Sequence, residues 1–213
     1  MTKRILILGA TSGIGALTVD EAVSRGYTVR AFARSAGDLE ATEQLEPFAG
    51  DALVADDLDK ALGGVDAVIY ALGIKESIAI LWQEVTLFSD TTRVLLTAMQ
   101  KQDVKRLIVV TGFGAGRSRA AMSKIEQIGH RALLGKPYAD KDRQEELIHE
   151  STLDWTIVRP VILTNNKQTG KYRVLRDETQ WRNGLISRAD VAHYLLDAVA
   201  DGTDIRRDVV LAR

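Results

Sequence analysis

The hydrophobic pattern starts with four consecutive apolar residues, Ile5 to Leu8, which lack the alternation of a half-exposed strand. Such a run is typical of a central parallel strand that is buried on both faces. Apolar residues then recur at helical spacing until Gly26, at Ala16, Val19, Ala22 and Val23. The start of the chain therefore predicts a strand, a glycine turn and a helix.

Short apolar runs and amphipathic stretches keep alternating along the rest of the chain. Further strands are expected at Thr28 to Ala33, Ala52 to Ala55, Val65 to Leu72, Arg106 to Val110, Trp155 to Arg159 and Val209 to Leu211. Helices are expected around Leu39 to Leu45, from Trp82 to Gln100, near Ala120 to Leu134, near Asp140 to Ser151 and from Val191 to Val199. Strands that alternate with helices form a parallel sheet through right-handed crossovers.

The predicted fold is an α/β, Rossmann-type doubly wound parallel sheet with three α/β/α layers, in a single domain over residues 1–213. In such a sheet the ligand binds beyond the carboxyl ends of the strands, at the switch point of the strand order. Pro160 is expected to stop the sixth strand. Substrate contacts are expected from segments near 74–90, 112–140 and 161–184, the last a polar excursion over the site.

Three glycines follow the first strand and predict a dinucleotide-binding turn. Gly9 allows a tight turn, Gly13 leaves no Cβ between the backbone and a diphosphate, and Gly15 lets the helix lie close to the sheet. The helix N-terminus offers N–H groups to an anion. The turn residues expected to bind the cofactor are Gly9, Thr11, Ser12, Gly13, Ile14 and Gly15. The alternative is a plain glycine turn; a phosphate loop is excluded because no Gly-Lys-Ser/Thr follows.

Composition narrows the function further. The chain is 46% hydrophobic, with 28 basic and 29 acidic residues and no cysteine. This balance gives no reason to expect nucleic acid or an anionic membrane as a partner. The absence of cysteine excludes disulfides and a cysteine nucleophile. A core strand begins by residue 4 and no apolar run is long enough to span a bilayer, so a cytoplasmic location is expected.

Cofactor choice is expected to depend on the end of the second strand. An acidic residue there would bind an unmodified ribose, and a basic residue would bind a 2′-phosphate. This chain has Arg34 and Ser35 at that position, which predicts NADP(H) in preference to NAD(H). In the alternative interpretation, Arg34 is a solvated surface residue and Asp38 reaches the ribose.

Two further strand ends carry candidate cofactor contacts. Asp57 and Leu58 are expected to meet the adenine, the carboxylate through its exocyclic amine and the leucine by packing on the ring. Asp57 is also interpreted as a helix N-cap, and the two roles are compatible. At the end of the fourth strand, Ala71, Leu72 and Gly73 would let the backbone pass close to the cofactor.

These motifs together resemble the atypical short-chain dehydrogenase/reductases, in the NAD(P)H-binding group that includes biliverdin/flavin reductase B-like and NmrA-like proteins. The matching segments are GATSGIG at 9–15, Arg34, DDL at 56–58, ALG at 71–73, VTGFGAG at 110–116, KDRQEELI at 141–148, LDWTIVRP at 153–160 and SRADVA at 187–192. The resemblance implies a Rossmann fold, a bound nicotinamide cofactor and either reduction of varied substrates or nucleotide binding alone.

The resemblance also places the candidate catalytic residues. Family members with full dehydrogenase chemistry carry Tyr-x-x-x-Lys, in which the lysine lowers the pKa of the tyrosine. Here Tyr138 and Lys141 have the spacing Tyr-x-x-Lys, which still shares one helix face, and Thr111 stands where a serine is expected. Thr111, Lys141 and Pro160 would also contact the cofactor. The alternative for Lys141 is an ion pair with Glu145.

The departures from the Tyr-x-x-x-Lys motif leave the proton relay to the substrate incomplete, which favours a reaction that needs no proton from the enzyme. We expect an NADPH-dependent oxidoreductase that transfers hydride to a flavin, a quinone or another conjugated or carbonyl small molecule, for which solvent can supply the proton. Phe113 would stack on the acceptor or pack under its loop. Arg159 is interpreted as a structural residue that forms an ion pair or holds backbone carbonyls.

Two other functions remain open. One is an NmrA-like redox sensor that binds NADP(H) without catalysis, and the other is carbonyl reduction or epimerisation through Tyr138 and Lys141. A monomer or homodimer is expected. His130, His149 and His193 lack metal-ligand spacing, and no Gly-x-Ser-x-Gly motif is present.

Overall fold

A twisted, mostly parallel sheet forms the centre of the protein. The computed structural model describes residues 3–73 and 85–213, and in this part of the chain the main sheet has eight strands in the order β3-β2-β1-β4-β5-β6-β10-β8. All neighbours run parallel except β8, which is antiparallel to β10. The strands are β1 (Arg4–Leu8), β2 (Thr28–Ala33), β3 (Leu45–Ala49), β4 (Ala67–Tyr70), β5 (Arg106–Val110), β6 (Asp154–Pro160), β8 (Arg173–Leu175) and β10 (Arg207–Ala212).

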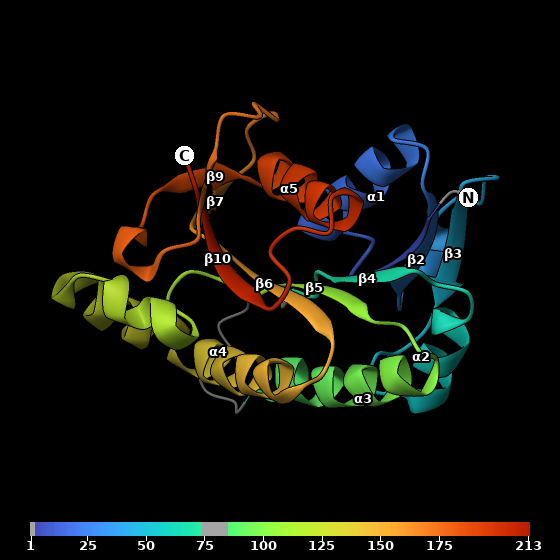
Figure 1. Cartoon of the computed structure of the whole chain (residues 1–213), viewed down its shortest axis with the longest axis horizontal. Helices are drawn as coiled ribbons and strands as arrows, with labels where there is room; N and C mark the ends of the chain where they lie inside the picture. The colour runs from blue at the N-terminus through green and yellow to red at the C-terminus, as the bar shows by residue number, and fades with distance from the viewer. Residues whose placement is uncertain (1–2, 74–84) are drawn as a thin grey trace.

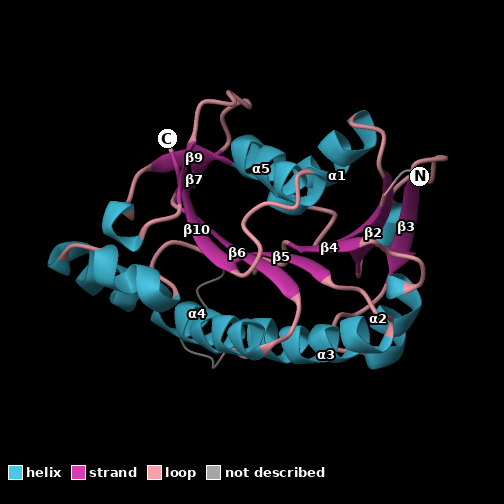
Figure 2. Ribbon diagram, in the orientation of Figure 1, coloured by secondary structure: helices cyan, strands magenta, loops and turns pink. Residues whose placement is uncertain are grey.

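Helices cover both faces of this sheet (Figure 1). Helices α1 (Gly13–Ser24) and α5 (Arg188–Ala200) pack together on one face. Helices α2 (Ala55–Leu62), α3 (Leu87–Lys101) and α4 (Lys124–Glu150) lie side by side on the other (Figure 2). Two apolar clusters, one on each face, form the core. The predicted three-layer α/β/α sheet is confirmed.

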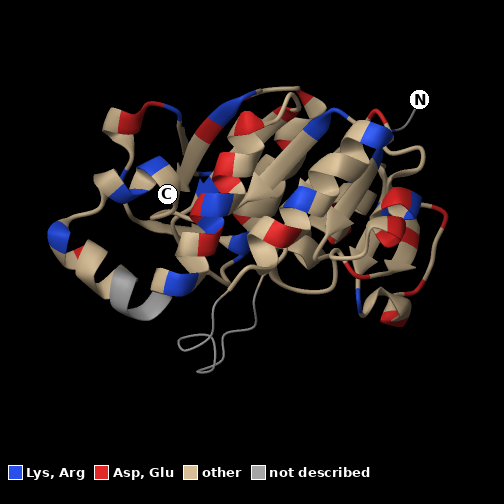
Figure 3. Ribbon diagram, turned by 90° about the horizontal axis from the view of Figure 1, so that it is seen from below, with Lys and Arg blue, Asp and Glu red and all other residues tan. Residues whose placement is uncertain are grey.

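Smaller elements lie between the main ones. Short 3-10 helices occur at η1 (Ala36–Asp38), η3 (Gly116–Ala121) and η4 (Glu178–Gln180), and β7 (Ile162–Thr164) pairs with β9 (Leu185–Ser187). Acidic and basic residues are interspersed along the elements seen from below (Figure 3). No helix among residues 3–73 and 85–213 is long and apolar enough to cross a membrane.

The prediction for the third strand was wrong. The strand is Leu45–Ala49, residues 39–44 form no helix, and Ala55 instead begins α2. Pro47 lowered the strand propensity of this segment, but β3 is an edge strand, where proline is tolerated because one side of the ladder needs no donor. The true carboxyl end of the third strand is therefore Ala49 to Asp51.

The two helices predicted around Pro137 are one continuous helix, α4. Its start is stabilised by a capping box between Ser123 and Glu126. Proline normally breaks a helix because it cannot donate the backbone hydrogen bond and clashes with the previous turn. Here tertiary contacts hold the turn after the proline, since the Asp140 carboxylate accepts hydrogen bonds from the Phe88 N–H at 2.7 Å and the Ser89 hydroxyl at 2.5 Å.

Helix α1 reaches the sheet through backbone-to-backbone contact. A Cβ on Gly15 would lie 2.1 Å from the Gly9 carbonyl oxygen, and a Cβ on Gly9 would lie 2.6 Å from the Ala71 carbonyl oxygen. Gly9 also has a φ of +80°, a conformation that side chains disfavour. The close helix–strand packing expected of Gly15 and the tight turn expected of Gly9 are both confirmed.

We predict that Gly15→Ala lowers the free energy of unfolding by about 2–3 kcal/mol, because the methyl group overlaps a backbone oxygen that cannot move away. Urea denaturation would measure the change. Gly129→Ala is the matched control, because Gly129 lies exposed in α4 with open space around it. There alanine should raise helix stability slightly. Equal effects at the two positions would contradict the argument.

Candidate functional site

The turn after β1 forms a cradle at the switch point of the sheet, between β2 and β4. The backbone N–H of Gly9 donates to the Phe32 carbonyl at 3.0 Å, and that of Ala71 donates to the Leu8 carbonyl at 3.0 Å. Gly13 has a φ of +58°, and a Cβ built on it would meet nothing within 4 Å. The residues thus leave open space at the start of α1, where free N–H groups and the helix dipole favour an anion.

The remaining turn residues face in different directions. Ser12 precedes α1 in extended conformation and is exposed, with no side-chain capping bond. Ile14, by contrast, buries its side chain in the core, so it can meet a ligand only through its backbone. A diphosphate therefore fits this cradle by contacts with backbone and hydroxyl groups.

The end of β2 lies against the same turn. The hydroxyl oxygens of Thr11 and Ser35 are 3.0 Å apart, so the structure brings two predicted residues from different loops together. Arg34 beside them is exposed and forms no ion pair with the part of the chain that the structure describes. Asp38 ends η1 and is also exposed. One exposed cation and two hydroxyl groups thus flank the cradle.

The predicted adenine contacts need correction. Asp57 and Leu58 lie inside α2, not at a strand end, and Leu58 is fully buried in the core. A buried leucine cannot pack on the ring of a bound ligand. Asp57 is not the N-cap, a position that Val54 occupies; its carboxylate instead accepts from the Asp51 N–H at 2.9 Å.

The residues at the actual end of β3 were missed by the sequence analysis. Asp51 follows the strand directly, and Leu53 is 48% exposed. The Gly50-Asp51 pair after an apolar segment was the available signal, and the displaced third strand concealed it. At the end of β4, Ala71 and Leu72 come close to Gly9, whereas Gly73 is exposed.

The three candidate catalytic residues meet at the end of β5. The Lys141 ammonium donates to the Thr111 carbonyl oxygen at 2.9 Å and lies 4.2 Å from the centroid of the Phe88 ring. The Tyr138 hydroxyl lies against Gly112, where a Cβ would be only 2.5 Å from it. A side chain at position 112 would therefore displace the Tyr138 ring.

The electrostatics at this end do not match a working tyrosine–lysine relay. Burial, together with the nearby Glu145 carboxylate, raises the pKa of Tyr138 to about 12. Burial lowers the pKa of Lys141 to about 8, against the opposing pull of Glu145 and Asp140. Among the described residues Tyr138 has no hydrogen-bond partner, so Lys141 does not stabilise its anion as the relay requires.

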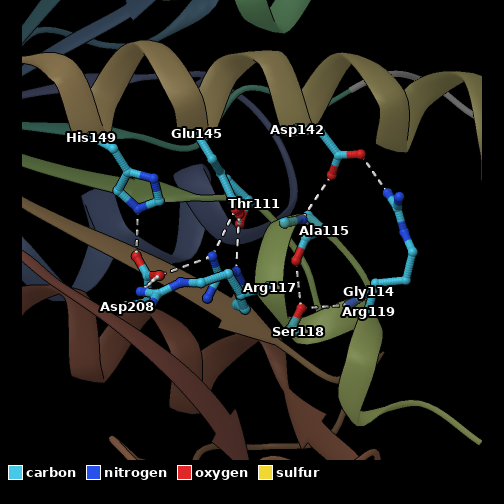
Figure 4. Close-up of polar contacts among 12 residues, drawn as sticks. Thr111, Gly114, Ala115, Arg117, Ser118, Arg119, Asp142, Glu145, His149 and Asp208 are labelled. Carbon is cyan, nitrogen blue, oxygen red and sulfur yellow. Dashed lines mark hydrogen bonds and ion pairs between the residues drawn. The ribbon is translucent and has the colours of Figure 1, made fainter. Parts of the chain in front are cut away.

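A buried charge network includes Thr111 and Glu145 (Figure 4). The Thr111 hydroxyl donates to Glu145 Oε1 at 2.7 Å. The same carboxylate accepts from Arg159 Nε at 3.0 Å and Nη2 at 2.7 Å, and Arg159 also reaches Asp208 at 3.2 Å. His149 lies 3.0 Å from Asp208. Despite its burial, hydrogen bonds and positive neighbours hold the pKa of Asp208 far below its usual range.

Two carboxylates, Asp142 and Asp208, anchor the loop after β5 (Figure 4). The Gly116 N–H donates to Asp142 at 2.7 Å, and Arg119 pairs with the same carboxylate. Arg117 joins Asp208 at 2.5 Å. The structural ion pair expected of Arg159 is therefore confirmed, and the alternative pairing of Lys141 with Glu145 was wrong, because Glu145 serves Arg159 and Thr111.

Two aromatic residues belong to the core. Phe113 is 5% exposed, which favours packing under the loop over stacking on an acceptor. Trp181 is equally buried and donates to the Leu175 carbonyl at 3.0 Å. At the end of β6, the Pro160 carbonyl accepts from the Phe113 N–H at 2.9 Å. The ends of β5 and β6 thus form one wall of the site.

Two chloroplastic plant proteins are similar in sequence. An uncharacterised protein of Arabidopsis thaliana is 29% identical over 208 residues, covering 93% of this chain and 72% of that protein. Protein TIC 62 of Pisum sativum is 29% identical over 176 residues, covering 73% of this chain but only 32% of TIC 62. This chain therefore spans about a third of TIC 62.

Solved structures give the same fold. ChuY of Escherichia coli O157:H7, described as an anaerobilin reductase, has a TM-score of 0.82 at 25% identity, covering 99% of this chain and 97% of that one. A short-chain dehydrogenase/reductase of Veillonella parvula in complex with NADP has a TM-score of 0.83 at 17% identity, covering 100% and 95%. The second likeness shows the shared fold alone.

A family described as NAD(P)H-binding matches residues 9–202. The match includes the glycine turn, the wall formed by β5 and β6, and α4. It supports binding of a nicotinamide cofactor. The chain belongs to the NAD(P)H-binding family.

Proposed function

We propose that this protein is an NADPH-dependent reductase that transfers hydride to a flavin, a quinone or another conjugated small molecule. The observation that carries the cofactor assignment is the open cradle at Gly13, flanked by the Thr11–Ser35 contact and the exposed Arg34. A guanidinium and two hydroxyl groups suit a 2′-phosphate, which binds by charge-assisted hydrogen bonds.

The roles of the remaining residues follow from their places around the cradle. The backbone from Gly9 to Gly15 would hold the diphosphate, and Asp51 takes the adenine role first assigned to Asp57. Lys141 and Thr111 at the end of β5, with Pro160 at the end of β6, would border the nicotinamide half. The bound cofactor supplies the hydride; the chain orients the ring and excludes water from one face.

The proposed class of hydride acceptor follows from the weak acidity of Tyr138. A tyrosine with a pKa of about 12 is a poor acid near neutral pH. The Thr111 hydroxyl already donates to Glu145. Conjugated acceptors do not require an enzyme acid, because solvent can protonate the reduced product. The description of ChuY as an anaerobilin reductase supports an extended conjugated acceptor.

The same weak donor also favours a second candidate, an NmrA-like sensor that binds NADP(H) and does not turn over. Carbonyl reduction through Tyr138 and Lys141 is the third and least supported reaction. The cytoplasmic location and the monomeric or homodimeric state stay predictions.

The first test compares the dissociation constants of NADPH and NADH. We expect Arg34→Ala to weaken NADPH binding about tenfold and to leave NADH unchanged, because only the 2′-phosphate contacts the guanidinium. Arg93→Ala is a suitable control, since Arg93 is an exposed arginine on α3 that pairs with Asp90. Equal losses for both cofactors would contradict the NADP assignment.

Tyr138→Phe tests the reaction class. We expect NADPH oxidation with a flavin or quinone to stay within about threefold of the wild type, because solvent supplies the proton. Abolished turnover would favour carbonyl chemistry. Tight NADPH binding by the wild type, without turnover of any acceptor in a broad panel, would instead favour the sensor.

Lys141 should link stability to pH. Its folded pKa of about 8 lies below the usual lysine value of about 10.4. Between these values the unfolded chain binds a proton that the folded chain has lost, so rising pH favours folding. The free energy of unfolding of the wild type should therefore rise relative to Lys141→Met between pH 7.5 and 10.5, measured in urea. A difference independent of pH would contradict the lowered pKa.

A further inference from the structure

The Thr111 hydroxyl has a fixed hydrogen-bond polarity. Its oxygen lies 2.7 Å from Glu145 Oε1, and Glu145 and Arg159 are 2% and 0% exposed. A buried guanidinium stays charged and needs an anionic partner. The ionised carboxylate can only accept, so the single Thr111 proton points at Glu145.

The remaining capacity of Thr111 is therefore to accept. A hydroxyl has one proton and two lone pairs, and only lone pairs remain for a ligand. The side chain lies directly after β5, beside Gly112 and the Lys141 ammonium, and keeps 7% exposure. It cannot protonate a substrate from this arrangement, which revises the catalytic role expected from the sequence.

We propose that Glu145 makes Thr111 an obligate hydrogen-bond acceptor, and that the donor it takes from the ligand is the carboxamide N–H of the nicotinamide ring. This inference rests on the proposed function, which places the nicotinamide half at the end of β5. The carboxamide amine is the donor group carried by the reactive ring itself. An acceptor fixed at that position would select one face of the ring for the substrate. Glu145 is then a positioning residue, acting through Thr111.

The test uses binding of two probes, NADP⁺ and its 3-acetylpyridine analogue. The analogue keeps the ring carbonyl but replaces the amine with a methyl group, so it lacks the donor. We expect the wild type to bind NADP⁺ about tenfold more tightly than the analogue, as for loss of one hydrogen bond to a buried partner. Thr111→Val should bind the two within about twofold of each other.

The matched control is Thr156→Val. Thr156 is a fully buried threonine at the opposite end of the neighbouring strand β6, where its hydroxyl donates to the Asp204 carbonyl at 2.8 Å. This variant should keep the wild-type preference. Adenosine 2′,5′-bisphosphate, which has no nicotinamide, should bind all variants equally and so reports on the adenosine half of the site.

Glu145→Gln tests whether Glu145 acts on the ligand by orienting the Thr111 hydroxyl. The glutamine amide can donate to the Thr111 oxygen, which releases the hydroxyl proton toward the ligand. The preference for NADP⁺ should then fall although Thr111 is intact. Thr111→Ser keeps the hydroxyl and should retain the preference for NADP⁺ over the analogue. This variant replaces Thr111→Val or Glu145→Gln if either of them fails to bind the bisphosphate.

The experiment distinguishes a failure of the proposed function from a failure of this inference. A wild type that binds no dinucleotide would overturn the proposed function itself. A wild type that binds NADP⁺ and the analogue equally, or a preference unchanged in Thr111→Val, would overturn this inference and leave the reductase proposal standing.

Discussion

The rest of the structure depends on one close approach between backbones. At Gly9 the turn after β1 touches α1 through Gly15 and the end of β4 through Ala71, with no side chain between them. These contacts set how far α1 stands from the sheet and how closely β1 and β4 meet at the switch point. The open space at Gly13 is a consequence, because the helix starts where the neighbouring strand leaves room for a ligand.

A second constraint acts at the other half of the site. Buried charges are costly unless they are paired and hydrogen-bonded, yet Glu145, Arg159 and Asp208 are all buried together. Their contacts join α4, β6 and β10, and through Arg117 they include the loop after β5. Rigid support of this kind suits a site that holds a ligand in one orientation. Within residues 3–73 and 85–213, the buried Arg159 Nη1 has no hydrogen-bond partner.

Much of the fold could be predicted because its strands are buried on both faces and read as continuous apolar runs. The bounds of β2 and β5 were predicted to the residue, and the glycine turn identified the cradle. The misplaced third strand shows the limit: Pro47 is disfavoured in most strands, and only its edge position makes it acceptable. That one error moved the adenine assignment from Asp51 to Asp57 and Leu58.

The sequence could predict which residues lie in the candidate site, but not which hydrogen bonds and contacts they make there. The sequence placed Thr111, Tyr138 and Lys141 together, and the structure agrees. It could not tell that Glu145 takes the Thr111 proton, because the competition among Lys141, Arg159 and Thr111 for one carboxylate is settled by tertiary geometry. The Tyr138–Gly112 contact was hidden for the same reason.

The charge network joins residues that lie far apart in the second half of the sequence. Thr111 lies near the middle of the sequence and Arg159 follows it on β6, while Asp208 lies on β10, which comes after the other strands of the sheet in the sequence. During synthesis on the ribosome, the Rossmann half with β1, β2 and the cradle can emerge and pair first. The guanidinium of Arg159 then lacks one of its two carboxylates until Asp208 has left the exit tunnel. The nascent protein would therefore form the glycine turn well before the wall at the ends of β5 and β6 becomes rigid.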